Sequence, residues 1–181
     1  MTTTLKQIGA FSSPPRVGLF VTCLVDAMRP SVGFATLKLL RDAGCRVEVP
    51  DAQTCCGQPA GNSGDKDGAA RLAKQVIAAF EGYDYLVAPS GSCVGQIRSY
   101  PTLFGDPDWR RRAEDLAAKS FEILGFLHDV MGWSPKDVRL DASATYHDSC
   151  SGLRELGVET QPRALLAGID GLEMRPLTGA N

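Results

Sequence analysis

Val17-Gly-Leu-Phe-Val-Thr-Cys23 is a continuous apolar run that stops at a cysteine, and it predicts a short strand buried on both faces. Residues 31–43 then carry apolar side chains at helical spacing, and Gly44 ends this expected helix. Further segments extend the alternation, with predicted strands at 46–49, 85–88 and 144–147 and predicted helices at 65–80, 109–131 and 163–167. Strands that alternate with helices are typical of a parallel sheet with helices on both faces, so we predict an α/β fold.

The 181 residues have the composition of an ordinary folded chain, with 44% hydrophobic and 22% charged residues. This composition excludes intrinsic disorder, and the net charge of −2 gives no electrostatic signature of nucleic-acid binding. The longest strongly apolar run, Val17–Val25, is too short for a transmembrane helix. Residues 1–14 are expected to be a flexible polar leader, and no Gly-rich phosphate-binding motif is present. We therefore expect a cytoplasmic protein without a transmembrane segment, nucleotide or flavin.

Six cysteines are the most informative feature, because a cytoplasmic protein of this size does not need disulfides. Five of them lie directly after predicted strands or in the following loops: Cys23, Cys55, Cys56, Cys93 and Cys150. The carboxyl ends of parallel strands meet at one edge of a sheet, where ligands bind in such folds, so these five cysteines are expected at that edge. Cys45 precedes a predicted strand and is expected to be a small buried core residue.

The spacing of the first four of these cysteines favours a polynuclear metal site. Residues 24–54 separate Cys23 from the Cys55-Cys56-Gly57 motif, and residues 57–89 separate Cys56 from Ser90-x-x-Cys93. Thiolates are soft ligands that favour iron–sulfur clusters, zinc or copper(I). Adjacent side chains diverge, so the vicinal pair suits neighbouring irons of one cluster better than a single ion. Four thiolates also suit tetrahedral zinc, and zinc stays open as the alternative.

Three strings carry a family resemblance: Leu19-Phe-Val-Thr-Cys-Leu-Val-Asp26, Cys55-Cys-Gly-Gln-Pro-Ala60 and Pro89-Ser-Gly-Ser-Cys93. Together they resemble the CCG-type cysteine-rich (Fe–S)-binding domain, which is found in heterodisulfide reductase and in the iron–sulfur subunit of glycolate oxidase. The detail is most similar to the lactate-utilization protein A group. The resemblance implies a Rossmann-like α/β repeat and a 4Fe–4S cluster, cubane or noncubane, held by Cys23, Cys55, Cys56 and Cys93.

The surroundings of this cluster follow from the same motifs. Gly57, Ser90 and Gly91 are expected close to it, because glycines let the backbone approach a bulky group and donate N–H bonds to its sulfurs. Ser90 stands where the wider pattern has the first cysteine of Cys-x-x-Cys, which argues against a five-cysteine noncubane cluster. In protein prepared in air the cluster can be absent, leaving free thiols or a Cys55–Cys93 or Cys23–Cys56 disulfide.

A second copy of the pattern begins near the end of the sequence. His147-Asp-Ser-Cys150 resembles the end of the first strand, with Cys150 in the place of Cys23. We therefore expect residues 15–140 to form a first cysteine-rich repeat and residues 141–181 to form the start of a second, truncated one. At the same offset Cys55 maps to a position beyond Asn181, so Cys150 is expected to be an orphan ligand of an incomplete site.

The resemblance implies a function. The protein is expected to be an iron–sulfur electron-transfer subunit that works with a ferredoxin-type Fe–S subunit and a third small subunit in oxidising L-lactate. It would lie in the cytoplasm, peripheral to the inner membrane only through these partners. Glycolate or another 2-hydroxy acid stays open as the substrate, and the exposed apolar edge of an incomplete repeat predicts self-association.

Two functions of other kinds also remain open. One is a thiol or heterodisulfide redox enzyme in which Cys55, Cys56 and Cys93 react directly. The other is a zinc-bearing structural subunit with no electron transfer.

Overall fold

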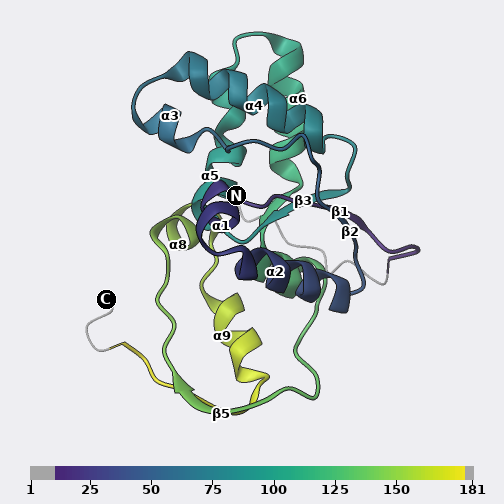
Figure 1. Cartoon of the computed structure of the whole chain (residues 1–181), viewed down its shortest axis with the longest axis vertical. Helices are drawn as coiled ribbons and strands as arrows, with labels where there is room; N and C mark the ends of the chain where they lie inside the picture. Colours follow the sequence, from purple (N-terminus) through teal and green to yellow (C-terminus); the bar gives the residue numbers. More distant parts are fainter. Residues whose placement is uncertain (1–10, 178–181) are drawn as a thin grey trace, which may run out of the picture.

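Four parallel strands form the central sheet of the computed structural model, which describes residues 11–177 (Figure 1). The sheet order is β2-β1-β3-β4, and the strands are β1 (Arg16–Leu19), β2 (Arg46–Glu48), β3 (Tyr85–Ala88) and β4 (Ser120–Glu122). β1 pairs with β2 and with β3, so it lies inside the sheet and is paired on both sides. The expected α/β fold with a parallel sheet is therefore confirmed. The predicted leader falls largely on residues 1–10, which lie outside the described residues.

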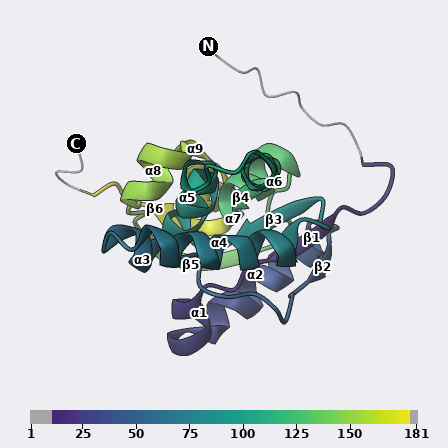
Figure 2. The ribbon, with the colours of Figure 1, turned by 90° about the horizontal axis from the view of Figure 1, so that it is seen from above.

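Helices cover both faces of this sheet (Figures 1 and 2). On one face lie α4 (Lys66–Phe80), α5 (Gly91–Ser99) and α6 (Pro107–Ala118), whose buried side chains contact Phe20, Leu86 and Ala88. On the other face lie α2 (Pro30–Asp42), the π-helical segment η2 (Phe126–Val130) and α9 (Thr160–Ala167), which pack against Val17, Leu19 and Val87. Alternate residues of each strand thus enter opposite core layers, as the continuous apolar runs predicted.

Gly18 interrupts the apolar run of β1 for a steric reason. A Cβ atom at this position would come within 2.7 Å of the ring of Phe80, which is fully buried against β1. Glycine therefore lets α4 lie close to the sheet. Burial of one such aromatic side chain stabilises the fold by roughly 1.5–3 kcal/mol.

Short helices lie in the connections that follow the strands. They are α1 (Cys23–Met28), α3 (Gln58–Asn62), α7 (Ile123–Gly125) and α8 (Cys150–Leu156), with the 3-10 turn η1 (Tyr100–Leu103) after α5. The helices α1, α5 and α8 were not predicted, yet their starts carry helix-capping side chains. Thr22, Ser90 and Ser149 each accept a hydrogen bond from a backbone N–H in the first turn of the helix that follows.

The prediction of one helix over 109–131 is wrong. α6 ends at Ala118, and residues 120–122 form the edge strand β4, paired with β3. The carbonyl of Ser120 accepts two hydrogen bonds from the guanidinium of Arg98 on α5, at 2.8 and 3.0 Å. Tertiary pairing here overrides the helical periodicity of the local sequence.

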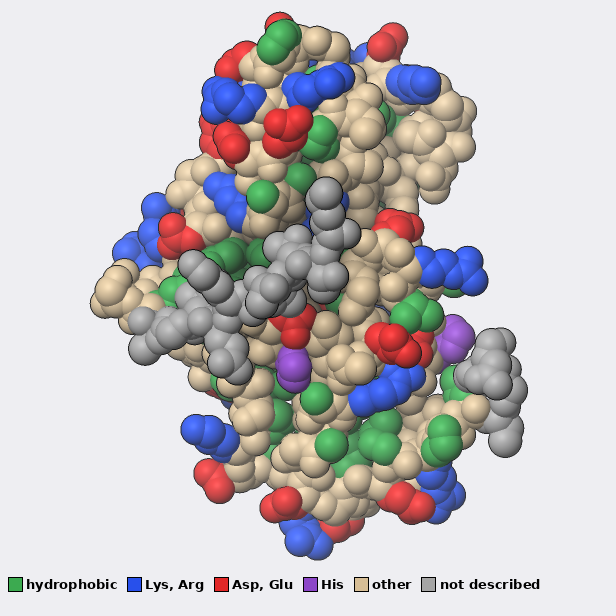
Figure 3. Space-filling model, turned by 180° about the vertical axis from the view of Figure 1, so that it is seen from behind, with side chains coloured by type: hydrophobic (Ala, Val, Ile, Leu, Met, Phe, Trp, Pro, Cys, Tyr) green, Lys and Arg blue, Asp and Glu red, His purple; other side chains and the backbone are tan. Residues whose placement is uncertain are grey.

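Two further strands form a separate parallel sheet, β5 (Arg139–Ala144) and β6 (Asp170–Met174), at the bottom of Figure 1. The strand predicted at 144–147 is thus displaced, since β5 ends at Ala144. β5 is exposed almost throughout its length, and Leu140 retains 52% of its surface. In the view from behind, hydrophobic side chains come to the surface in this lower part of the molecule (Figure 3).

Among residues 11–177, none of the helices has the length and apolarity that a membrane span requires.

Candidate functional site

Three loops at the carboxyl edge of the central sheet bring four thiols together. β1 leads to Cys23, the first residue of α1, and β3 leads to Cys93 in the first turn of α5. The loop after β2 carries Cys55 and Cys56 just before α3. β1 is the strand next to both β2 and β3, so its loop lies between the other two. The topology of the sheet therefore explains why thiols from residues 23–93 meet.

The backbone turns sharply at the vicinal cysteines. Gly57 has a φ of +83°, a left-handed conformation that a side chain would strain, and it stands at the start of α3. Its N–H donates to the Sγ atom of Cys55, at an N···S distance of 3.5 Å. The turn thus provides a backbone donor to the thiol of Cys55.

The thiols fall into two pairs whose members influence each other's pKa. Cys55 raises the pKa of Cys23, and Cys56 lowers that of Cys93. Cys23 is exposed and Cys55 is half-buried, whereas Cys56 and Cys93 retain only 3% and 9% of their surface. One pair therefore faces solvent and the other faces the core. All four are free cysteines.

The pairs influence each other electrostatically. Hydrogen bonds from Cys56, Ser90 and Ser92 lower the pKa of Cys93 to about 6, although burial opposes the shift. The pKa of Cys56 is raised by its hydrogen bond to Cys93 and by burial. Burial and the neighbouring Cys55 raise the pKa of Cys23, and Cys93 contributes to the same shift. Ionisation is therefore favoured at Cys93 over its partner Cys56.

Two neutral side chains hold the loop that carries Cys55 and Cys56. No sequence motif assigned either of them to the site. Gln53 accepts a hydrogen bond from the N–H of Val21 through Oε1, at 2.8 Å. The hydroxyl of Tyr100 donates to the carbonyl of Cys56, also at 2.8 Å. No local sequence signal marks Gln53. Tyr100 belongs to the hydrophobic core on the side of the sheet covered by α4, α5 and α6.

The four thiols offer a single kind of donor atom. Within the described residues, no three His, Cys, Asp or Glu side chains lie close enough together to hold one metal ion. The chemistry of the donors, which are sulfur atoms only, is that of a soft metal site.

The exposed pair opens into a hollow of about 450 Å³. Its walls include Cys23 and Cys55, the carboxylates Asp26 and Asp51, and Gln53. Cys56 and Cys93 are buried, so the side of Cys23 and Cys55 is the more accessible one.

Cys150 does not join the four thiols. It begins α8 and lines a different hollow, of about 470 Å³, on the other side of the start of α5. Ser90 and Gly91 line that second hollow as well. The Ser90 hydroxyl caps α5 by accepting from the N–H of Cys93 at 3.5 Å, while Gly91 packs against the backbone of Gly152 in α8. Of the expected neighbours of the site, Gly57 and Ser90 contact its cysteines, and Gly91 serves helix packing.

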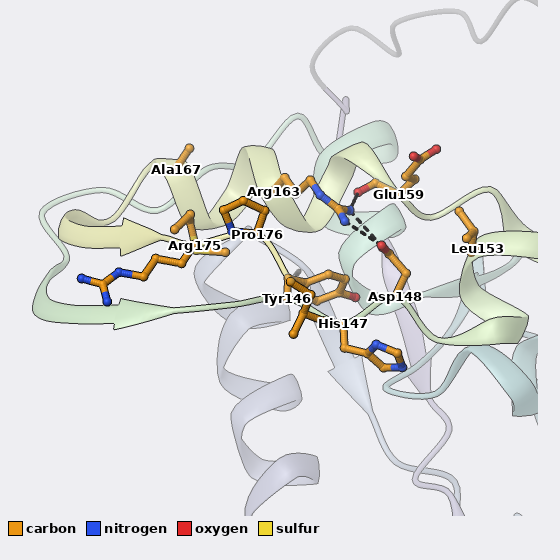
Figure 4. Close-up of a pocket in the computed structure, with 11 residues that line it drawn as sticks. Tyr146, His147, Asp148, Leu153, Glu159, Arg163, Ala167, Arg175 and Pro176 are labelled. Atoms are coloured by element: carbon orange, nitrogen blue, oxygen red, sulfur yellow. Dashed lines mark hydrogen bonds and ion pairs between the residues drawn. The ribbon is translucent and has the colours of Figure 1, made fainter. Parts of the chain in front are cut away.

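A larger hollow, of about 770 Å³, lies between α9 and the segments that follow β5 and β6 (Figure 4). An ion pair between Arg163 and Asp148 crosses it, at 2.6 Å, and the arginine also lies over the ring of Tyr146. This ion pair lowers the pKa of Asp148. The hollow is lined by no cysteine, so it is distinct from both cysteine sites.

Comparison with known families defines the class of this protein. A family model described as "Cysteine-rich domain", of the CCG type, matches residues 17–98. The match runs from β1 to α5 and includes Cys23, Cys55, Cys56 and Cys93. The fold and the four-thiol site thus belong to a CCG cysteine-rich domain.

Curated relatives narrow the class further. A lactate utilization protein A from Exiguobacterium sp. is 51% identical over 170 residues, which cover 92% of this chain and 69% of the relative. Proteins of the same name from Geobacillus kaustophilus and Bacillus velezensis are 48% and 46% identical; the alignments cover 92% and 91% of this chain, and 70% and 69% of these relatives. The chain belongs to the lactate utilization protein A family.

Proposed function

We propose that this protein is an iron–sulfur electron-transfer subunit of a system that oxidises L-lactate. The observation that carries the proposal is the meeting of four thiols from three loops at one edge of the sheet, with no other ligand type among them. The name of the relatives supports lactate as the substrate of the system. Glycolate or another 2-hydroxy acid remains the alternative substrate.

Cys23, Cys55, Cys56 and Cys93 are the proposed ligands of a 4Fe–4S cluster. Such a cluster takes up and releases one electron at a time. The buried Cys56 and Cys93 would anchor it to the core. The Gly57 N–H donates to the Sγ atom of Cys55, and the Ser90 hydroxyl accepts from the backbone N–H of Cys93. Cys23 and Cys55 leave one side accessible to a redox partner through the hollow of about 450 Å³.

The proposed partners are a ferredoxin-type Fe–S subunit and a third small subunit of the lactate-oxidising system. The proposed location is the cytoplasm, with attachment to the inner membrane only through these partners. Self-association of this chain also stays a prediction, supported by the exposed Val138 and Leu140 of the second sheet. Sedimentation velocity over a range of concentrations would test it.

Metal analysis tests the proposed cofactor directly. Protein prepared without oxygen, or reconstituted with iron and sulfide, is expected to contain about four iron and four sulfide atoms per chain and to absorb broadly near 400 nm. Cys55→Ser is expected to lose this absorbance, because it removes one of the four ligands. Cys150→Ser is the matched control and is expected to keep it, because Cys150 lies outside the group.

Two results would contradict the proposal. One zinc ion per chain without sulfide would indicate the structural zinc subunit instead. Equal loss of iron in the Cys150→Ser control would show that the ligand set is wrong.

One observation favours a thiol redox enzyme as the second candidate function, namely the contact between Cys56 and Cys93. In this function the two thiols would reduce a substrate disulfide to two thiols, giving up two electrons and two protons as they form their own disulfide. Absence of any metal after reconstitution, together with a Cys56–Cys93 disulfide found by mass spectrometry, would support it.

A further inference from the structure

The loop that carries Cys55 and Cys56 is held on both sides by hydrogen bonds from uncharged side chains. On one side it faces the loop with Cys23, and on the other it faces the helix with Cys93. Each side has one long-range hydrogen bond that crosses between the segments. These bonds join segments whose cysteines are far apart in sequence.

Gln53 connects the loop to Cys23. Its Oε1 accepts from the N–H of Val21, two residues before Cys23, across 32 residues of sequence. Its Nε2 donates to the carbonyl of Pro50 at 3.2 Å, and its own backbone N–H donates to the same carbonyl. The side chain is thus locked in its own loop while it holds the neighbouring one. Gln53 itself precedes Cys55 by two residues.

Tyr100 connects the same loop to Cys93. It follows α5, the helix that carries Cys93, and its side chain is fully buried. Its hydroxyl donates to the carbonyl of Cys56 at 2.8 Å, across 44 residues. Burial and the nearby cysteines raise the pKa of Tyr100, so the hydroxyl keeps its proton and remains a donor.

We propose that Gln53 and Tyr100 are positioning residues of the four-thiol site, each setting the spacing of one thiol pair. Gln53 sets the distance between Cys23 and Cys55, and Tyr100 sets the distance between Cys56 and Cys93. The inference rests on the proposed function, in which these thiols bind a cluster. Neither side chain is a ligand, since an amide and a protonated phenol are poor donors to iron beside four thiolates.

Loss of either bond has a defined physical effect. Tyr100→Phe leaves the buried carbonyl of Cys56 without this donor and frees the Cys55–Cys56 turn. Gln53→Met keeps the length of the side chain but removes the acceptor for Val21. Hydrogen bonds around a metal site typically change metal affinity by about 10- to 100-fold when they are removed. Both variants are therefore expected to weaken iron binding by at least about tenfold.

The experiment compares these two variants with two matched controls. Tyr83→Phe removes a tyrosine hydroxyl that bonds to Glu48, at 3.2 Å. Gln161→Met removes an amide that accepts from the N–H of Glu159 and donates to Asp129. All four proteins and the wild type are reconstituted anaerobically. Iron retained against a chelator, the reduction midpoint and the EPR signal of the reduced protein are then measured, with the melting temperature of each apoprotein.

The proposal predicts that Tyr100→Phe and Gln53→Met change iron retention, midpoint and EPR signal, and that the controls do not. Variants that match the controls in all three readouts would overturn it while leaving the cluster proposal intact. A wild type that binds no iron would overturn both. If Gln53→Met melts well below the wild type as apoprotein, Tyr100→Phe decides the question, because removal of one hydroxyl preserves the packing of the ring.

Discussion

Glu122 illustrates how burial acts on a single residue at the same edge of the sheet. It is the last residue of β4, and its carboxylate accepts from the N–H groups of Leu124 and Gly125, at 2.8 and 3.2 Å. Burial raises its pKa despite these two hydrogen bonds. A raised pKa of a carboxyl group in the folded state means that the charged form is disfavoured there, so folding stability declines as the pH rises through this pKa.

Glu122→Gln is therefore expected to stabilise the apoprotein at neutral pH. Glutamine keeps an acceptor oxygen for the two N–H groups and removes the buried charge. The gain in melting temperature is expected to shrink as the pH falls toward about 4, where the glutamate is protonated in both the folded and unfolded states. Thermal melts between pH 4 and 8 check this, with Glu114→Gln at an exposed position as the control. A gain that is constant with pH would contradict the explanation.

At the scale of secondary structure, the contact between α5 and α8 depends on small residues. A Cβ atom at Gly91 would lie 2.9 Å from the backbone nitrogen of Gly152, closer than real Cβ atoms approach. The obstructing atom belongs to the backbone, so a side-chain rotation cannot relieve the clash. The two helices can pack at this distance only because residue 91 is glycine.

Gly91→Ala is expected to destabilise the protein by roughly 1–3 kcal/mol, because it separates α8 from α5. Gly105→Ala is the control, since a Cβ atom there meets nothing within 4 Å. Urea unfolding of the two apoproteins measures the difference. Equal unfolding midpoints would show that α8 moves without loss of stability.

The elements also show where local pattern and tertiary structure diverge. Strands β1, β2 and β3 and helices α2 and α4 follow from apolar periodicity and from glycines at their ends, and their bounds agree closely with the prediction. β4 does not follow from periodicity, because residues 120–122 become a strand only through pairing with β3. The start of α5 does not follow either, because its Pro-Ser-Gly-Ser segment is typical of a turn, although Ser90 caps the helix.

At the scale of the whole molecule, the two sheets differ sharply in burial. β1 is paired on both sides, and Val17 and Leu19 are buried between two helix layers. β5 has a single partner, β6, and most of its residues are exposed. Local opening is easier where few apolar contacts protect the backbone hydrogen bonds.

Amide hydrogen exchange is therefore expected to be much faster in β5 and β6 than in β1 and β3. Exchange followed by mass spectrometry of peptides from 139–144 and 85–88 measures the contrast in one sample. Equal protection of the two sheets at low protein concentration would contradict this prediction. Protection of β5 that grows with concentration would indicate the self-association proposed above.

The relation between the two sheets supports the proposal that a second repeat begins near residue 141. Val17 pairs with Val47 in the central sheet, and Ala144 pairs with Met174 in the second sheet. The shift in numbering that carries Cys23 onto Cys150 also carries Val17 onto Ala144 and Val47 onto Met174. Two residues that pair in the first sheet therefore map onto two residues that pair in the second. β5 begins at Arg139, slightly before the proposed boundary.

Local sequence pattern was enough to predict the parallel sheet and the edge at which Cys23, Cys55, Cys56 and Cys93 gather. Apolar periodicity and strand direction are properties of short segments, and the parallel arrangement then directs every strand end to one side. The pairing of Cys23 with Cys55 and of Cys56 with Cys93 was decided only by the packed molecule. So were the separation of Cys150 from the four thiols and the contacts made by two further side chains, Gln53 and Tyr100. These contacts join segments 32 to 44 residues apart, and their geometry depends on how the loops and helices pack rather than on any local preference.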